Sequence, residues 1–262
     1  MAAGEIDNSA REMPIALELR KVGKTFRSDT GAEVRALENV SFLVHQGDFV
    51  TLVGATGCGK TTLLNLIAGL DTADDGHLQL GPGLRFGDNI AYVFQHYTLF
   101  PWRTAVSNVS FGLKMRGVPL RQRQTGAAEL LNRVGLKGFE DAYPHELSGG
   151  MRQRAAIAQA LAIEPKLLLM DEPFGAVDDS TRTELQQMLT DLWQENQTTV
   201  VFVTHNIDEA IVLGNRVLVF SERPGRVSCE FDISLPRPRN RVTREFTDLF
   251  IRIRKSLSGQ LD

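Results

Sequence analysis

The sequence is poor in cysteine and has no long apolar run. Cys58 and Cys229 are the only cysteines among 262 residues, and a disulfide-stabilised secreted domain would need a denser set. We therefore expect a reducing, cytosolic setting. No apolar run approaches the roughly 20 residues that a membrane-spanning helix needs, so the chain is not expected to form a membrane channel by itself.

A strong charge of either sign is also missing. The chain carries 29 Lys and Arg against 32 Asp and Glu, a formal net charge of −3, and the two signs are spread along it, so no basic field is available to hold a polyanion. Nucleic acid is therefore not an expected partner. Residues 1–12 are polar and lack the basic start and apolar stretch of a secretion signal, and we expect residues 1–14 to form a flexible leader.

The first third of the chain alternates between strand-like and helix-like patterns. Residues 16–22 alternate apolar and polar side chains, and residues 40–44 form a short apolar run, which together predict a β-layer. Residues 48–53 are β-rich and lead through glycines into residues 61–68, which are apolar at helical spacing and stop at Gly69. This order predicts a strand, a glycine loop and a helix.

The middle of the chain separates into strand-like ends and a helical interior. The apolar runs 167–170 and 200–203 both end at polar residues, as parallel strands do at their carboxyl ends, so the core is expected to be α/β. Between Gln95 and Pro165 the sequence loses β character and gains helix-like stretches, at residues 126–134 and 151–163. We expect an inserted helical subdomain at about residues 96–164.

The end of the chain is broken by proline and glycine and then becomes amphipathic. Residues 223–226 and 235–239 interrupt regular structure, and residues 241–262 are predicted to form a helical tail after a main domain at 15–240. One face of the tail would be apolar, with Phe246, Leu249, Phe250, Ile253 and Leu257. This stripe can pack on the protein's own body or form a docking surface, and both interpretations stay open.

Residues 54–61, Gly-Ala-Thr-Gly-Cys-Gly-Lys-Thr, match the phosphate-loop pattern. Glycines in such a loop let successive backbone N–H groups curl round phosphate oxygens at a helix N-terminus. Lys60 is expected to neutralise charge on the β- and γ-phosphates and to be a catalytic residue, and Thr61 to offer its hydroxyl to Mg²⁺. The expected ATP contacts from this region are Gly54, Ala55, Thr56, Gly57, Cys58, Gly59, Lys60, Thr61 and Thr62.

Two acids follow the apolar run 167–170. Asp171 is expected to hold Mg²⁺ through water, and Glu172 to polarise the attacking water. Acids at strand ends are commonly solvated loop residues, but their pairing with a phosphate loop favours a nucleotide site. A third element, residues 147–154, places Ser148, Gly149 and Gly150 at a predicted helix start with free N–H groups. The plain alternative for this element is a helix cap by Ser148.

The run Leu-Ser-Gly-Gly-Met-Arg-Gln-Arg at 147–154 resembles the signature sequence of ABC ATPases. The resemblance covers about residues 17–235 and implies a P-loop NTPase (RecA-like) core with an antiparallel β-subdomain and an inserted α-helical subdomain. It also implies that the signature contacts the γ-phosphate of ATP bound to the opposite subunit, so that two copies clamp ATP between them.

The remaining motifs of that family appear in the expected order. Gln95 resembles the Q-loop glutamine, which touches Mg²⁺ or the attacking water, and His205 resembles the switch histidine that hydrogen-bonds the γ-phosphate. Asp178 lies in a run that resembles the D-loop at the subunit junction. Phe26 corresponds to the A-loop aromatic that stacks on adenine, with an ordinary core phenylalanine as the alternative. By this resemblance Glu172, His205, Gln95 and Lys60 are the catalytic residues, and Thr61, Gln95 and Asp171 are the metal ligands.

Small departures from the family pattern occur at three positions. Thr56 stands where serine is more usual, Val177 where leucine is more usual, and Asn206 where aspartate commonly follows the switch histidine. Each keeps similar size or polarity, so an active ATPase is expected.

The family resemblance implies membrane partners that this chain does not contain. An ABC subunit of this kind would bind integral-membrane permease subunits at the cytoplasmic face of the inner membrane, as a peripheral protein. Residues 96–103 concentrate aromatics beside a proline and a base, a composition suited to an interface anchor. Local core packing is the alternative for Tyr97 and Trp102.

Four runs narrow the resemblance to the nitrate, sulfonate, taurine and bicarbonate importers, which receive small, mostly anionic solutes from an external binding protein. These runs are residues 99–105, 171–176, 206–210 and 223–226. An exporter or lipid-transport ATPase would share every catalytic residue and is the main alternative. A non-transport ABC ATPase is a further one, although such proteins usually carry two nucleotide domains or a long coiled-coil insertion.

Overall fold

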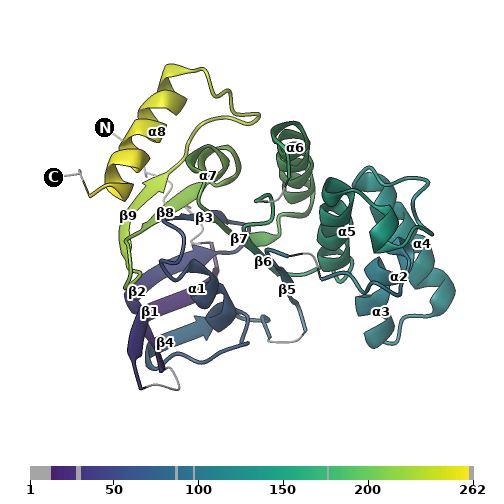
Figure 1. The fold of residues 1–262 in the computed structure, drawn as a ribbon, viewed down its shortest axis with the longest axis horizontal. Coiled ribbons are helices and arrows are strands. Elements are labelled where there is room, and N and C mark those ends of the chain that lie inside the picture. Colours follow the sequence, from purple (N-terminus) through teal and green to yellow (C-terminus); the bar gives the residue numbers. More distant parts are fainter. Residues whose placement is uncertain (1–12, 28–30, 86–87, 97, 176, 260–262) are drawn as a thin grey trace, which may run out of the picture.

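The computed structural model describes residues 13–27, 31–85, 88–96, 98–175 and 177–259. Most of the predicted leader, Tyr97 of the predicted interface anchor and the last three residues of the tail lie outside this part. In Figure 1, helices cover a central sheet and a second sheet lies beneath it, with a group of helices at one side. No helix in the described ranges is long and apolar enough to cross a membrane.

The central sheet has six strands in the order β5-β6-β7-β3-β8-β9. Neighbouring strands are parallel except β9, which is antiparallel to β8. Strands β3, β6 and β7 are buried along their whole length, as expected for parallel strands covered on both faces. The strands are β3 (Phe49–Val53), β5 (Ile90–Val93), β6 (Leu167–Asp171), β7 (Thr199–Thr204), β8 (Arg216–Phe220) and β9 (Val227–Asp232).

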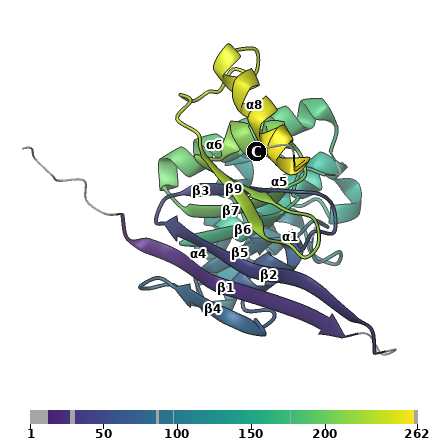
Figure 2. The same ribbon diagram turned by 90° about the vertical axis from the view of Figure 1, so that its left-hand side faces the viewer.

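A smaller antiparallel sheet forms a second layer, seen below the central sheet in Figure 2. Its order is β2-β1-β4, with β1 (Ile15–Arg27), β2 (Glu33–His45) and β4 (Asp75–Leu80). Helix α1 (Lys60–Ile67) shares one buried apolar cluster with both sheets, which includes Leu17, Val44, Leu63 and Leu169. The predicted strand–loop–helix unit and the predicted β-layer are therefore packed on each other.

Helices α6, α7 and α8 cover parts of the central sheet that α1 does not cover. Helix α6 (Asp179–Asn196) packs Leu185 and Leu189 onto Phe49 and Phe202. Helices α7 (Ile207–Leu213) and α8 (Arg244–Leu257) share a further apolar cluster with β8 and β9, in which Ile253 is fully buried. The apolar stripe of the tail thus packs on the protein's own body, which is the first of the two interpretations left open by the sequence.

The chain between β5 and β6 is helical, as the sequence predicted, and lies to the right in Figure 1. It has its own apolar core, which includes Val109, Leu131 and Ala158. Its elements are α2 (Ala105–Val109), α3 (Phe111–Met115), α4 (Leu120–Arg133), a 3₁₀ turn (Pro144–Glu146) and α5 (Gly149–Leu161).

The bounds of the two longer helices in this insertion differ from the sequence-based prediction. Helix α4 begins at Leu120, directly after Pro119, and not at residue 126. Its first two turns are largely exposed and polar, so they lack the apolar stripe on which the prediction relied. Helix α5 begins at Gly149 and ends at Leu161, in both cases two residues before the predicted bound, and is followed by Glu164 in the left-handed region at φ 48.

Candidate active site

The phosphate-loop motif lies between the carboxyl end of β3 and the start of α1, as predicted. Gly59 precedes the first residue of α1 with φ 106, a conformation that side chains avoid. A Cβ there would lie 2.7 Å from the carbonyl oxygen of Ala36 in β2. The loop is therefore wrapped tightly against the smaller sheet, and glycine is required at this position.

Lys60 is buried at the centre of this loop. Its ammonium group donates hydrogen bonds to the carbonyl oxygens of Gly54, at 2.8 Å, and Ala55, at 2.9 Å, and lies 4.0 Å from Glu172 Oε1. The lysine is only 4% exposed. A positive charge held in this way beside the loop's backbone amides suits the binding of an anion such as phosphate.

Two of the side chains predicted to hold Mg²⁺, Thr61 and Asp171, meet where β6 ends. Thr61 Oγ1 donates to Asp171 Oδ1 at 3.2 Å, and Tyr92 lies on the other carboxylate oxygen at 3.5 Å. Burial raises the pKa of Asp171, and the negative charge of Glu172 adds to that rise, whereas the hydrogen bond from Thr61 opposes it. Mg²⁺ prefers oxygen ligands, and a buried carboxylate is stabilised by a nearby positive charge. The carboxylate of Asp171 and the hydroxyl of Thr61 therefore fit Mg²⁺.

Among the described residues, no group of three or more His, Cys, Asp or Glu side chains could hold a metal ion. The usual Mg²⁺ site of nucleotide enzymes needs no such group, because it combines one or two protein oxygens with substrate phosphates and water. Tyr92 was not identified from the sequence as part of this site. Burial raises the pKa of its phenol, and the carboxylate of Asp171 adds to that rise, so Tyr92 is a neutral hydrogen-bond donor here.

Glu172 and His205 form a contact between neighbouring strands. His205 Nδ1 lies 2.9 Å from Glu172 Oε2, and the two residues follow the carboxyl ends of the parallel pair β6 and β7. Glu172 has φ 41 in the left-handed region, a conformation that costs about 1–3 kcal/mol for a residue other than glycine and is concentrated at functional sites. The carboxylate is thereby presented between His205 and Lys60.

The other predicted site residues lie on separate elements. Phe26 is 44% exposed at the end of β1, so the alternative of a core phenylalanine is wrong. Gln95 is exposed just after β5, the neighbour of β6. Ser148 caps α5 by accepting a hydrogen bond from the Met151 backbone at 3.2 Å, and Asp178 caps α6. Ser148 is therefore a helix cap, as the alternative interpretation of this run required, and Gly149 and Gly150 form the start of the helix.

A hairpin loop that the sequence analysis did not assign to the site supports the phosphate loop. Arg223, between β8 and β9, donates two hydrogen bonds to the carbonyl oxygen of Gly57, at 2.9 and 3.2 Å. The nearby Gly225 donates its backbone N–H to Ala36 at 2.9 Å. Its missing side chain leaves room for the carbonyl oxygen of Cys58, which would lie 2.1 Å from a Cβ at this position.

Gly225→Ala is expected to disturb the phosphate loop, although Gly225 is not part of it. Because the new methyl group would displace either the hairpin or the backbone of Cys58, we expect a loss of about 1–3 kcal/mol in the free energy of unfolding together with weaker ATP binding. Thermal unfolding and nucleotide titration measure these effects. The matched control is Gly126→Ala in α4, where nothing lies within 4 Å of the added atom, and unchanged values for both variants would contradict the proposed support.

Comparisons with known proteins place the chain among nucleotide-binding subunits. The family model described as ABC transporter matches residues 37–175. The nitrate import ATP-binding protein NrtD of Synechocystis is 46% identical over 236 residues, which is 86% of this chain and 87% of that protein. The taurine import ATP-binding protein TauB of Rhizobium johnstonii is 49% identical over 218 residues, 81% of this chain and 82% of that protein.

A solved structure extends the likeness to three dimensions. The ATP-binding cassette MJ0796, in a dimeric post-hydrolysis state bound to ADP and Pi, is 33% identical and superposes with a TM-score of 0.74. The match covers 84% of this chain and 100% of that one. The similarity therefore extends over most of the fold described above.

Proposed function

The chain belongs to the ABC transporter ATP-binding proteins, and from this premise we propose that it powers the import of a small, mostly anionic solute. Its activity is that of an ABC transporter ATPase. The observation that supports import most strongly is the extent of the likeness to nitrate and taurine import subunits, at 46% and 49% identity over more than four fifths of the chain. Nitrate, sulfonate, taurine and bicarbonate are the solute types that we propose.

The contacts of the site suggest a role for each residue. We assign to Lys60 and the amides of residues 54–62 the binding of the ATP phosphates, and to Phe26 the stacking on adenine. Thr61 and Asp171 would hold Mg²⁺ with Gln95 nearby, and the metal would neutralise charge between the phosphates. We assign to Glu172 the polarisation of the attacking water. His205, whose Nδ1 lies 2.9 Å from Glu172 Oε2, would orient this carboxylate and hydrogen-bond the γ-phosphate.

A second copy of the chain would complete each site. Ser148, Gly149 and Gly150 start α5 in the helical insertion, and Asp178 starts α6, so these residues belong to elements other than the phosphate loop. We propose that they contact ATP held by the other copy. The related cassette MJ0796 was solved as a dimer, and a head-to-tail dimer would bury two nucleotides in one two-fold interface.

An exposed aromatic cluster supports the proposed docking to a permease at the cytoplasmic face of the membrane. Trp102 is 71% exposed and lies 5.7 Å from the ring of Phe100, so local core packing is wrong for this tryptophan. The rings of Phe100 and Phe111 contact each other, and the Arg103 guanidinium lies over both, at 5.1 and 4.5 Å from their centres. A rigid aromatic anchor beside a cation is typical of protein interfaces.

Trp102→Ala is expected to uncouple the subunit from its permease. An anchor residue of an interface typically contributes 2 kcal/mol or more to binding, so solute uptake should fall roughly tenfold or further at equal expression. The matched control is Val242→Ala, another exposed apolar residue away from this cluster, which should leave uptake unchanged. Equal uptake by both variants would contradict the docking role.

Uptake by cells tests the proposed solute class directly. The gene is deleted in the native host, and uptake of labelled nitrate, taurine, an alkanesulfonate and bicarbonate is measured, with wild-type or Glu172→Gln chain restored. Loss of one anion's uptake that only the wild-type chain restores would support the proposal. Normal uptake of all four, with a defect in export or in lipid distribution, would favour the exporter alternative.

A further inference from the structure

A buried carboxylate lies directly behind the segment that carries His205. Glu209, in the first turn of α7, accepts hydrogen bonds from Thr204 Oγ1 at 2.6 Å and from Gln186 Nε2 at 3.4 Å. Its backbone N–H donates to Asn206 Oδ1 at 3.3 Å, and the backbone of Asn206 donates to Thr204 Oγ1 at 2.9 Å. Glu209 is therefore tied to both chain neighbours of His205.

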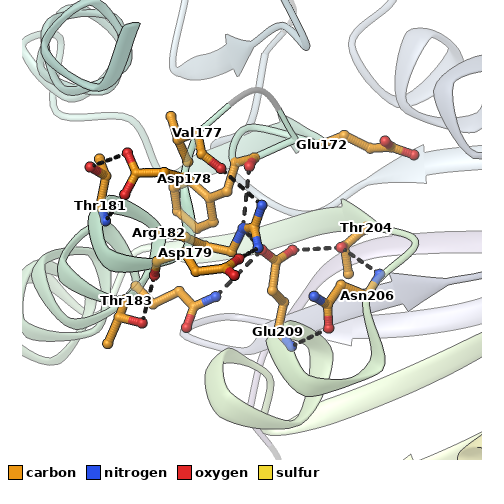
Figure 3. Close-up of polar contacts among 12 residues, drawn as sticks. Glu172, Val177, Asp178, Asp179, Thr181, Arg182, Thr183, Thr204, Asn206 and Glu209 are labelled. Atoms are coloured by element: carbon orange, nitrogen blue, oxygen red, sulfur yellow. Dashed lines mark hydrogen bonds and ion pairs between the residues drawn. The ribbon is translucent and has the colours of Figure 1, made fainter. Parts of the chain in front are cut away.

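The other side of Glu209 is bound by Arg182 of α6, as Figure 3 shows. Arg182 Nε lies 3.4 Å from Glu209 Oε1, while Nη2 donates to the carbonyl oxygen of Val177 at 2.9 Å and Nε to that of Phe174 at 3.4 Å. A further contact, Nη1 to Asp179 Oδ1, is 2.5 Å long. One guanidinium thus joins the His205 segment to the chain that enters α6.

The start of α6 is in turn packed on the start of α5, the signature helix, which begins with Gly149 and Gly150 of the signature run. Asp178 accepts hydrogen bonds from the backbone and hydroxyl of Thr181, at 3.0 and 2.7 Å. The methyl group of Thr181 is so close to Gly150 that a Cβ there would lie 2.6 Å from it. Close-packed contacts of this kind transmit displacement, because they have no room to absorb it.

The chemistry of the pair favours a fixed geometry. Burial raises the pKa of Glu209, and the hydrogen bond from Thr204 and the charge of Arg182 oppose that rise. The planar guanidinium serves a carboxylate and two carbonyl groups at fixed angles, which a lysine ammonium cannot reproduce. The side chain of Glu209 is only 7% exposed, so this ion pair is not a solvated surface contact.

We propose that the Arg182–Glu209 pair is a positioning device that couples the two ATP sites of a dimer. The inference rests on the proposed function, in which His205 serves the ATP of its own copy while Gly150 and Asp178 serve that of the other. Movement of the His205 segment on hydrolysis shifts Glu209, and Arg182 passes that shift to the start of α6 and the adjacent signature helix. Both residues are therefore positioning residues, and we expect neither to touch the nucleotide.

The test measures ATP hydrolysis by the purified chain as a function of ATP concentration. Two coupled sites give a Hill coefficient of at most two, and we expect about 1.5 or more for the wild type and about 1 for Arg182→Lys and Glu209→Gln. The matched control is Arg216→Lys. Arg216 also joins two acids, Asp48 and Glu230, and a backbone carbonyl, but does so at the start of β8, so its variant should keep the wild-type coefficient.

The outcomes separate this inference from the proposed function and from simple loss of stability. Variants with lower melting temperatures but the wild-type Hill coefficient would show that the pair is only structural and would overturn the inference. A wild-type coefficient of 1 would overturn it as well, while the dimer itself is tested independently by the mass of Glu172→Gln with ATP. If Arg182→Lys fails to fold, Thr204→Val removes the hydroxyl bound to Glu209 and should give the same fall toward 1.

Discussion

Glu172→Gln is expected to reduce ATP hydrolysis about 10²–10⁴-fold, the usual contribution of a positioned general base, while ATP binding is retained. Glutamine keeps the size of the side chain and can still contact His205, but it cannot polarise water. The change also removes one negative charge beside Asp171, where the γ-phosphate would lie. ATP should therefore accumulate on the enzyme and hold two copies together.

Hydrolysis rate, nucleotide content and particle mass measured on one preparation test this expectation. The variant with ATP should have the mass of a dimer and contain two ATP molecules, and it should return to a monomer when the nucleotide is removed. Glu129→Gln, at an exposed position of α4, is the matched control and should behave as the wild type. Brisk hydrolysis by Glu172→Gln would place the base elsewhere.

Lys60→Ala is expected to weaken ATP binding itself. The ammonium group lies within hydrogen-bonding distance of two loop carbonyls and is the buried cation of the loop. A hydrogen bond to a charged group contributes about 1.5–3 kcal/mol, so ATP affinity should fall by roughly 10- to 100-fold, with hydrolysis lost at ordinary ATP concentrations.

A titration with a fluorescent ATP analogue measures this loss. Because Lys60 also ties the loop to itself, thermal unfolding without nucleotide is measured in parallel to exclude a general loss of structure. Lys137→Ala, an exposed lysine in the helical insertion, serves as the control for removal of a positive charge. Unchanged affinity in a folded Lys60→Ala protein would contradict the assignment of the phosphate loop.

The parts of the fold that follow local rules were predictable from the sequence. The glycine loop between β3 and α1 has its own residue pattern, and β6 and β7 are continuous apolar runs because both of their faces are covered. The final helix was predicted from a stripe at helical spacing, and that stripe packs on α7, β8 and β9, with Phe246 and Ile253 buried. These signals lie in consecutive residues, so they do not depend on distant partners.

The contacts between distant segments could not be predicted in the same way. Tyr92 reaches Asp171 only because β5 and β6 are neighbours in the sheet, and Arg223 reaches Gly57 across 166 positions of sequence. The partners of Glu209 come from α6 and from the end of β7. An isolated arginine or glutamate in a sequence carries no sign of such a partner, since most of them are solvated.

The central claim is that this ATPase works on a membrane permease, and purification of the tagged chain from gently solubilised native membranes tests it most directly. Mass spectrometry of the isolated complex should identify a protein with several membrane spans in an amount equal to that of this chain. Recovery of soluble factors or ribosomal components alone would contradict the transport function, even if every catalytic assignment held.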